Sequence, residues 1–203
     1  MRTQTAIYNG KEVIIDNRVN LGKIFQEHNQ IGVGAEIGVL YGTYTNQLFE
    51  DWKGQILAVD IWTERPQYLR AIDQLWNTNT IITRGSSTDV ANIIKDGSLD
   101  WVYLDGDHTY KGINEDMSAW FPKIRKGGVI SGHDYINWHE MTQDEKNTSP
   151  YLDPDLEKNL VYKGVDEFCE KHGYKFELLH DHIMLIDGEL RHFPDLASWW
   201  FIK

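Results

Sequence analysis

The sequence contains a single cysteine, Cys169, so no disulfide can form within the chain. An unpaired cysteine is typical of a reducing compartment. No apolar run approaches the roughly 20 residues that a membrane-spanning helix needs. The first residues, MRTQTAIYNGKEVIID, also lack the apolar centre of a secretion signal. These absences predict a cytoplasmic protein without a membrane partner.

Basic side chains are scarce as well, because 20 Lys and Arg stand against 31 Asp and Glu, a formal net charge of −11. Non-specific binding to nucleic acid depends on clustered Lys and Arg that neutralise phosphates. The only basic cluster, KIRK at 123–126, falls where we expect a helix to end, and basic side chains are common there. The composition therefore argues against nucleic acid as a partner.

Apolar runs of strand length alternate with segments of helical spacing along most of the chain. We expect strands within 31–39, 55–62, 80–87, 100–108, 128–135, 174–180 and 182–188, and helices within 17–30, 43–52, 65–77, 88–97, 113–127 and 161–173. This alternation predicts a parallel sheet with helices on both faces. The last two strands are separated by too few residues for a crossover, so we expect them to pair antiparallel.

The predicted fold class is therefore α/β: a Rossmann-like three-layer sandwich whose seven-stranded sheet is mostly parallel, with one antiparallel strand near the C-terminus. We find no linker that would divide residues 1–203, and we expect a single domain. The terminal SWWFIK is expected to pack Trp199 and Trp200 against the sheet edge or against a partner subunit, which leaves a homo-oligomer open.

The first predicted strand runs into the turn EIGVLYG at 36–42, where a sheet of this kind binds its ligand. The dinucleotide pattern G-x-G-x-x-G is absent, and the carboxylate of Glu36 would repel a pyrophosphate. Glu36 instead favours an ammonium group, while the helix that starts after Gly42 offers N–H donors to a carboxylate. These are the two charged groups of an amino acid.

Asp60 ends the second predicted strand, 22 residues after Gly38, where an acid can accept hydrogen bonds from a ribose diol. An amino-acid end at the first turn and a ribose at the second describe S-adenosylmethionine. The alternative is that Gly38 is an ordinary turn glycine and Asp60 a helix cap. The combination, in this order on this fold, favours the cofactor.

From EIGVLYG through VDIW, RGSS and LDGDHTY to GGVISGHDY, the chain resembles the class I S-adenosylmethionine-dependent methyltransferases. The pair DGDHTY and GGVISGHDY resembles the small-molecule O-methyltransferases that include macrocin O-methyltransferase, and the related cephalosporin hydroxylase group. The resemblance implies methyl transfer to a hydroxyl of a sugar or of a glycosylated small molecule.

The resemblance also implies roles for individual residues. The methionine part of the cofactor would lie among Glu36, Gly38, Tyr41, Gly42 and Thr43; the ribose at Asp60; the adenosine beside Trp62; the adenine at Ser86 and Ser87; and Asp105 would complete the set. Ser87 has an alternative role as the N-cap of the next helix.

A sugar hydroxyl is a poor nucleophile until a base removes its proton or a cation stabilises the alkoxide. The fourth predicted strand ends in Asp105, Asp107 and His108, the fifth in His133 and Asp134, and neighbouring strand ends converge. We therefore expect catalytic roles for Asp105, His108 and His133, with Asp107 in support. For His108, capping of the next helix is the alternative.

In related families a divalent cation is held by the first acid of the fourth-strand motif and by an acidic pair after the fifth strand. The resemblance places such a cation, Mg²⁺ or Mn²⁺, at Asp105, His133 and Asp134. His133 stands where an acid is usual, and an imidazole ligand shifts preference away from Mg²⁺ towards Mn²⁺ or Zn²⁺. Alternatively, His133 replaces the metal as a general base.

Residues 136–160 form a long polar segment after the fifth predicted strand, which we interpret as an insertion that covers the acceptor. Trp138, His139 and Tyr151 there could stack on a sugar face or pack the segment onto the domain. Two other functions stay open: a catechol-type phenolic O-methyltransferase and a non-catalytic cofactor-binding module.

Overall fold

The structure is a computed structural model and describes residues 4–8, 11–15, 18–28, 32–137, 160–179, 184–186, 189–191 and 197–203. Most of the predicted insertion at 136–160, including Trp138, His139 and Tyr151, lies outside the described residues. Within the described part of the chain, no helix combines the length and apolarity that a membrane crossing requires.

The largest sheet has seven strands. In spatial order they are β5 (Thr80–Arg84), β4 (Gln55–Asp60), β3 (Val33–Ile37), β6 (Leu99–Leu104), β7 (Ile124–Tyr135), β11 (Ala197–Ile202) and β8 (Glu177–Leu179). The first five run parallel to one another, whereas β11 is antiparallel to both of its neighbours. The predicted fold class, a mostly parallel sheet with one antiparallel strand, is confirmed.

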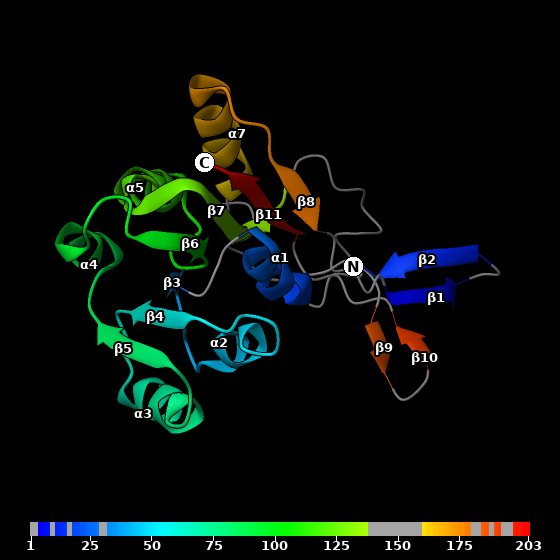
Figure 1. Cartoon of the computed structure of the whole chain (residues 1–203), viewed down its shortest axis with the longest axis horizontal. Helices are drawn as coiled ribbons and strands as arrows, with labels where there is room; N and C mark the ends of the chain where they lie inside the picture. Colours follow the sequence, from blue (N-terminus) through cyan, green and yellow to red (C-terminus); the bar gives the residue numbers. More distant parts are fainter. Residues whose placement is uncertain are drawn as a thin grey trace.

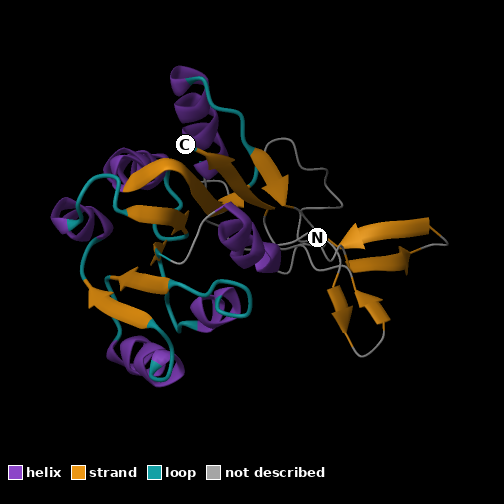
Figure 2. Cartoon of the chain, in the orientation of Figure 1, coloured by secondary structure: helices purple, strands orange, loops and turns teal. Residues whose placement is uncertain are grey.

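Helices cover both faces of this sheet (Figures 1 and 2). They are η1 (Arg18–Asn20), α1 (Leu21–His28), α2 (Thr43–Leu48), α3 (Arg65–Leu75), α4 (Ser87–Ile93), α5 (Tyr110–Trp120), η2 (Phe121–Lys123) and α7 (Val161–His172). On one face, Phe25 of α1 stacks on Trp101 of β6, with ring centroids 4.2 Å apart. On the other face, residues of α4, α5 and α7 share one buried cluster with β3, β6 and β7.

The C-terminal pairing differs from the prediction. The expected strand at 182–188 is β9 (Met184–Ile186), which pairs with β10 (Glu189–Arg191) in a separate two-stranded sheet, as β1 (Gln4–Tyr8) does with β2 (Lys11–Ile15). The partner of β8 is β11. The terminal SWWFIK is thus an interior strand and not an edge: Trp199 is fully buried in the α5–α7 face, while Trp200 lies 5.8 Å from His28.

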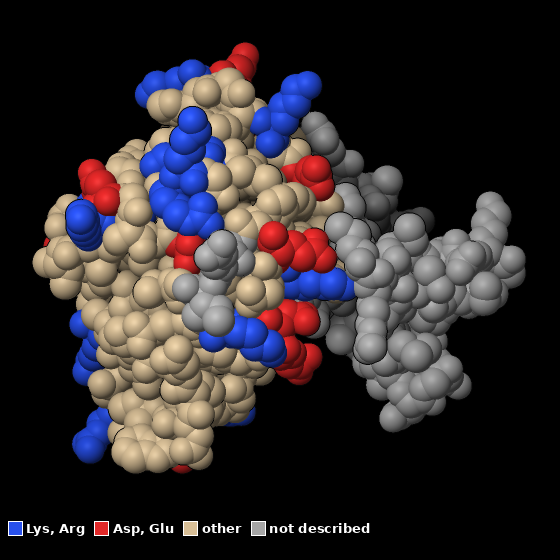
Figure 3. Space-filling view, in the orientation of Figure 1, with Lys and Arg blue, Asp and Glu red and all other residues tan. Residues whose placement is uncertain are grey.

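The helix predicted over 113–127 is also misplaced. It begins earlier, at Tyr110, and ends at Trp120. Pro122 cannot continue an α-helix, so the chain passes through one 3₁₀ turn and enters β7 at Ile124. The basic cluster 123–126 therefore opens a strand, and on the face that Figure 3 shows, basic side chains are interspersed with acidic ones.

Candidate functional site

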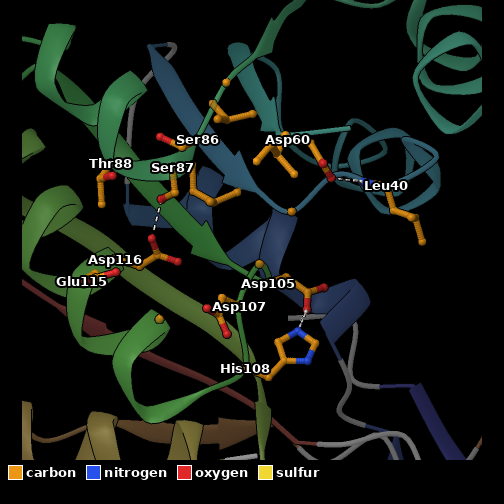
Figure 4. Close-up of a pocket in the computed structure, with 17 residues that line it drawn as sticks. Leu40, Asp60, Ser86, Ser87, Thr88, Asp105, Asp107, His108, Glu115 and Asp116 are labelled. Atoms are coloured by element: carbon orange, nitrogen blue, oxygen red, sulfur yellow. Dashed lines mark hydrogen bonds and ion pairs between the residues drawn. The ribbon is translucent and has the colours of Figure 1, made fainter. Parts of the chain in front are cut away.

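A cavity of about 620 Å³ opens beyond the carboxyl ends of β3, β4, β5 and β6, where the strand order reverses (Figure 4). Six predicted site residues line it: Gly38, Asp60, Ser86, Ser87, Asp105 and His108. The lining also includes Leu40, Gly106, Glu115 and Asp116. The sequence thus located the cavity, although it did not identify its whole lining.

Gly38 lets β3 and β6 approach each other at the cavity. Its φ is 88°, and a Cβ there would overlap the carbonyl oxygen of Asp105. The backbone N–H of Gly38 donates to the carbonyl of Val59 at 2.9 Å, and that of Asp105 donates to Ile37 at 2.8 Å. A side chain at position 38 would therefore disturb both strand ends.

We expect Gly38→Ala to lower the free energy of unfolding by about 2 to 6 kcal/mol, because backbone strain and overpacking each cost about 1 to 3 kcal/mol. Gly97→Ala is a matched control: Gly97 has a φ of 68°, but nothing lies within 4 Å of the added Cβ. We expect it to cost about 1 kcal/mol, the strain alone. Urea denaturation of both variants measures the difference, and equal losses would contradict the close approach.

Asp60 joins the turns that follow β3 and β4. Its carboxylate accepts the Leu40 N–H at 2.8 Å through Oδ2 and the Trp62 N–H at 2.7 Å through Oδ1. Both donors have left-handed backbones, with φ of 51° and 38°, an uncommon conformation outside glycine. Because each carboxylate oxygen has a second lone pair, Asp60 can hold these turns and still accept hydrogen bonds from a ligand.

Trp62 is not in the cavity lining. Its indole is fully buried in a cluster with Val39 and Leu75, and its Nε1–H donates to the Leu40 carbonyl at 2.7 Å. The structure thus gives the indole a core position that fixes the Leu40 turn. The predicted place of Trp62 beside the adenosine does not agree with this burial.

Tyr41, Gly42 and Thr43 contact α3 or open α2, and the cavity lining does not include them. Arg70 lies over the Tyr41 ring at 4.6 Å, and Thr43 Oγ1 donates to Gln74 at 3.3 Å. Gly42, with φ 79°, is the N-cap residue of α2. In this structure these three residues shape the turn above Glu36.

Glu36 lies one layer below the cavity, on the face of β3 that it shares with Tyr103 of β6. Its Oε2 and the neighbouring Thr45 Oγ1 are fully buried, and neither makes a hydrogen bond of ordinary geometry among the residues that the structure describes. Burial is the main reason that the pKa of Glu36 is raised to about 8. The Thr45 side chain and Arg18 oppose this shift, and the negative charges of Asp105 and Asp60 add to it. A buried carboxyl oxygen without such a hydrogen bond is what a ligand ammonium would satisfy.

The ends of β6 and β7 bring the predicted catalytic residues together. His108 Nε2 lies 2.8 Å from Asp134 Oδ2 and 3.4 Å from Asp105 Oδ1. His133 Nδ1 lies 3.3 Å from Asp134 Oδ1 and 3.9 Å from Asp105 Oδ1. Asp134 adopts a left-handed backbone with φ 57°, a strained conformation that turns this residue at the strand end.

The charges of this group decide which residue can act as a base. Burial alone would lower the pKa of His108, but its hydrogen bonds to Asp105 and Asp134 outweigh burial and raise the pKa to about 10. The pKa of Asp134 is lowered, because the two histidines outweigh the effect of its burial. In this arrangement His108 holds a proton between two carboxylates, so it is a proton donor and not a ready base.

A cation could occupy the same place. One ligand atom from each of Asp105, His108 and Asp134 lies within 4.8 Å of the others. The predicted ligand set had His133 in place of His108. The structure brings all four residues together, and His108 is the imidazole that belongs to the compact group.

Two residues at this site were not predicted from the sequence. Arg18 of η1 places Nη1 3.9 Å from Asp105 Oδ2, and its guanidinium lies 5.1 Å from the Tyr44 ring. Asp116 of α5 lines the cavity and is buried. Nothing in the sequence pointed to Arg18. Asp116 could have been found from the sequence, because its spacing places this acid on the same face of the helix as the apolar Ile113, Met117 and Trp120.

Comparison with known proteins gives matches of family and of fold. Residues 35–135 match the family described as a methyltransferase domain. A search of curated proteins gave no match. Among solved structures, the chain resembles a precorrin-6y C5,15-methyltransferase from Geobacter metallireducens, with 15% identity, a TM-score of 0.64 and coverage of 91% of this chain and 87% of that one.

Two further solved structures that the chain resembles are complexes with SAH or SAM. An O-methyltransferase from Bacillus cereus, solved in complex with SAH, is 18% identical with a TM-score of 0.61, over 93% of this chain and 83% of that one. An O-methyltransferase from Streptomyces achromogenes involved in tomaymycin synthesis, in complex with SAM, is 16% identical with a TM-score of 0.60, over 92% and 79%. At these identities the likeness is one of fold.

Proposed function

This chain belongs to the class I S-adenosylmethionine-dependent methyltransferases, and from that membership we propose that it transfers a methyl group to a hydroxyl of a sugar or glycosylated small molecule. One observation carries the proposal. Asp105 lines the cavity and is also part of the compact group with His108 and Asp134, so cofactor and acceptor sites share a residue.

The residues of the cavity fit the cofactor. S-adenosylmethionine supplies an electrophilic methyl group when it is bound. Asp60 can accept hydrogen bonds from the ribose hydroxyls, and Gly38 keeps the strand ends close beside it. Glu36 offers its buried carboxyl to the ammonium group. Neutral sulfur is a good leaving group, so most of what the protein must add is alignment and activation of the acceptor.

The acceptor hydroxyl would be placed at Asp105, His108 and Asp134. The Asp105 carboxylate can accept the hydroxyl proton, Asp134 can orient the hydroxyl, and protonated His108 can stabilise negative charge that develops on its oxygen. His133, behind Asp134, holds that carboxylate in place. Within this arrangement His133 is a positioning residue, and the role of general base falls to the Asp105 carboxylate instead of His133.

The same residues fit a divalent cation. Asp105, His108 and Asp134 would hold it, and two carboxylates with an imidazole suit Mn²⁺ or Zn²⁺ better than Mg²⁺. A bound cation would supply Lewis-acid stabilisation of the alkoxide. His108 would then have to give up its proton, because metal ligands bind deprotonated.

Labelled S-adenosylmethionine offered with a panel of sugars, glycosides and catechols tests the proposal. We expect incorporation into hydroxyls of the sugar-containing compounds, with at least tenfold preference over catechols, since His133 stands where catechol-type enzymes carry the first acid of a pair. Labelling of catechols alone would show that the acceptor is a phenol and not a sugar. Binding of the cofactor without transfer to any acceptor would favour a non-catalytic module.

The metal is tested with the same assay after exhaustive chelation and dialysis. If a cation is required, we expect activity to fall by at least about 10²-fold and to return with Mn²⁺ better than with Mg²⁺. Full activity after chelation would exclude the metal route and leave Asp105 and Asp134 as the activating groups. Thermal unfolding of the chelated protein is the control for loss of structure.

A further inference from the structure

Asp116 presents a buried carboxyl to the cavity beside Ser87, on the side away from His108 (Figure 4). Its side chain projects from α5 towards the start of α4, beside Ser87 and Thr88 (Figure 4). Only 6% of the residue is exposed, and burial raises the pKa of Asp116 to about 6. A carboxyl in such a place calls for a hydrogen-bond donor.

One oxygen of this carboxyl is already committed. The Trp120 Nε1–H donates to Ser87 Oγ at 2.8 Å, and Ser87 Oγ donates its single proton to Asp116 Oδ1. An indole N–H can only donate, so the direction of this chain is fixed. Whatever stands at position 116 must therefore offer an acceptor to Ser87.

The other oxygen is directed to the cavity. A Cβ at Gly106, a cavity-lining residue, would lie 3.8 Å from Asp116 Oδ2, so the absent side chain leaves this oxygen accessible. Within the described part of the chain, no donor hydrogen-bonds to Oδ2. Thr88 and Glu115 flank it at the cavity, and Glu115 pairs with Lys111 at 3.6 Å. The donor must come from water or from a ligand.

The cofactor offers three sets of donors, and this step rests on the proposed function. Ribose hydroxyls meet Asp60 and the ammonium meets Glu36, which leaves the 6-amino group of the adenine. The reacting end lies towards His108, so the base falls at the opposite end, where Ser87 and Asp116 are. We propose that Asp116 accepts a hydrogen bond from the adenine 6-amino group and thereby selects adenine over 6-oxopurines.

Calorimetric titration with S-adenosylhomocysteine and with its 6-oxo analogue, S-inosylhomocysteine, tests this selection. We expect the wild type to bind the adenine compound about 10- to 100-fold more tightly, the cost of an unpaired buried charged acceptor. In Asp116→Asn the amide oxygen must face Ser87, so the NH₂ group faces the cavity. We therefore expect the preference to fall at least tenfold or to reverse in favour of the 6-oxo compound.

Glu115→Gln is the matched control, because Glu115 is the adjacent acid on α5 and lies at the cavity with its side chain 53% exposed. It should keep the wild-type ratio of affinities. Equal binding of both compounds by the wild type, which needs no variant to fold, would overturn the inference. So would a folded Asp116→Asn protein with the wild-type ratio. A wild type that binds neither compound would overturn the proposed function itself, and this inference with it.

Discussion

Replacing Asp105 with asparagine is expected to slow methyl transfer by about 10²- to 10⁴-fold, the usual contribution of a positioned acid or base. The Asp105 carboxylate lies 3.4 Å from His108 Nε2 and 3.9 Å from Arg18 Nη1. Asparagine keeps the shape but removes the charge that holds the His108 proton or would hold a cation. Single-turnover rates with an acceptor found in the labelled screen measure the loss.

The affinity for S-adenosylhomocysteine separates chemistry from binding in this variant. We expect it to change less than about tenfold, because the carboxylate is directed at His108 and Arg18 and not at the ribose. Asp107→Asn is the control, because it removes the same charge two residues away. Asp107 Oδ1 accepts the Thr109 N–H at 2.9 Å, and an amide oxygen can keep this hydrogen bond. The rate of this control variant should fall less than about tenfold. A normal rate in Asp105→Asn would reject the assignment.

The order of strands and helices could be predicted because each buried strand of a parallel sheet is a short apolar run bounded by turn residues. That logic placed Asp60 and Asp105 at strand ends, and the structure has both at the cavity. It failed at the C-terminus, where strand pairing depends on residues distant in sequence. The alternation of Trp199 and Phe201 on one face with Ser198 and Trp200 on the other was a readable strand signal.

The candidate site was harder to predict where a residue acts from a helix. Trp62 lies two residues after Asp60, and only the left-handed turn at position 62 sends its indole into the core. A turn of that kind leaves no mark in the sequence of a non-glycine residue. Asp116 and Arg18 reach the site from elements predicted for packing alone. Motif spacing located the strand ends, whereas the three-dimensional path of the chain decided which other side chains reach them.

Glu36 should give two pH trends of opposite sign. Its pKa is raised from 4.5 to about 8 in the folded chain, so the folded state holds a proton that the unfolded state releases. The free energy of unfolding should therefore decrease as pH rises from about 4.5 to about 8, by up to about 1.4 kcal/mol per pH unit. Glu36→Gln removes this dependence and should be more stable than the wild type above about pH 7 in the absence of ligand.

Binding should follow the reverse course. If the Glu36 carboxylate pairs with the ligand ammonium, binding requires that the proton leave, so the affinity for S-adenosylhomocysteine should rise about tenfold per pH unit between about pH 5.5 and 7.5. In Glu36→Gln the affinity should be independent of pH above about pH 6. Any slope that remains below about pH 6 would come from Asp116. An affinity that is independent of pH in the wild type, beside a stability that falls, would show a buried carboxyl that the ligand does not contact. A proton that folding retains and the ligand displaces makes stability and affinity change in opposite directions with pH. Only such a proton also makes both trends vanish in the single variant Glu36→Gln.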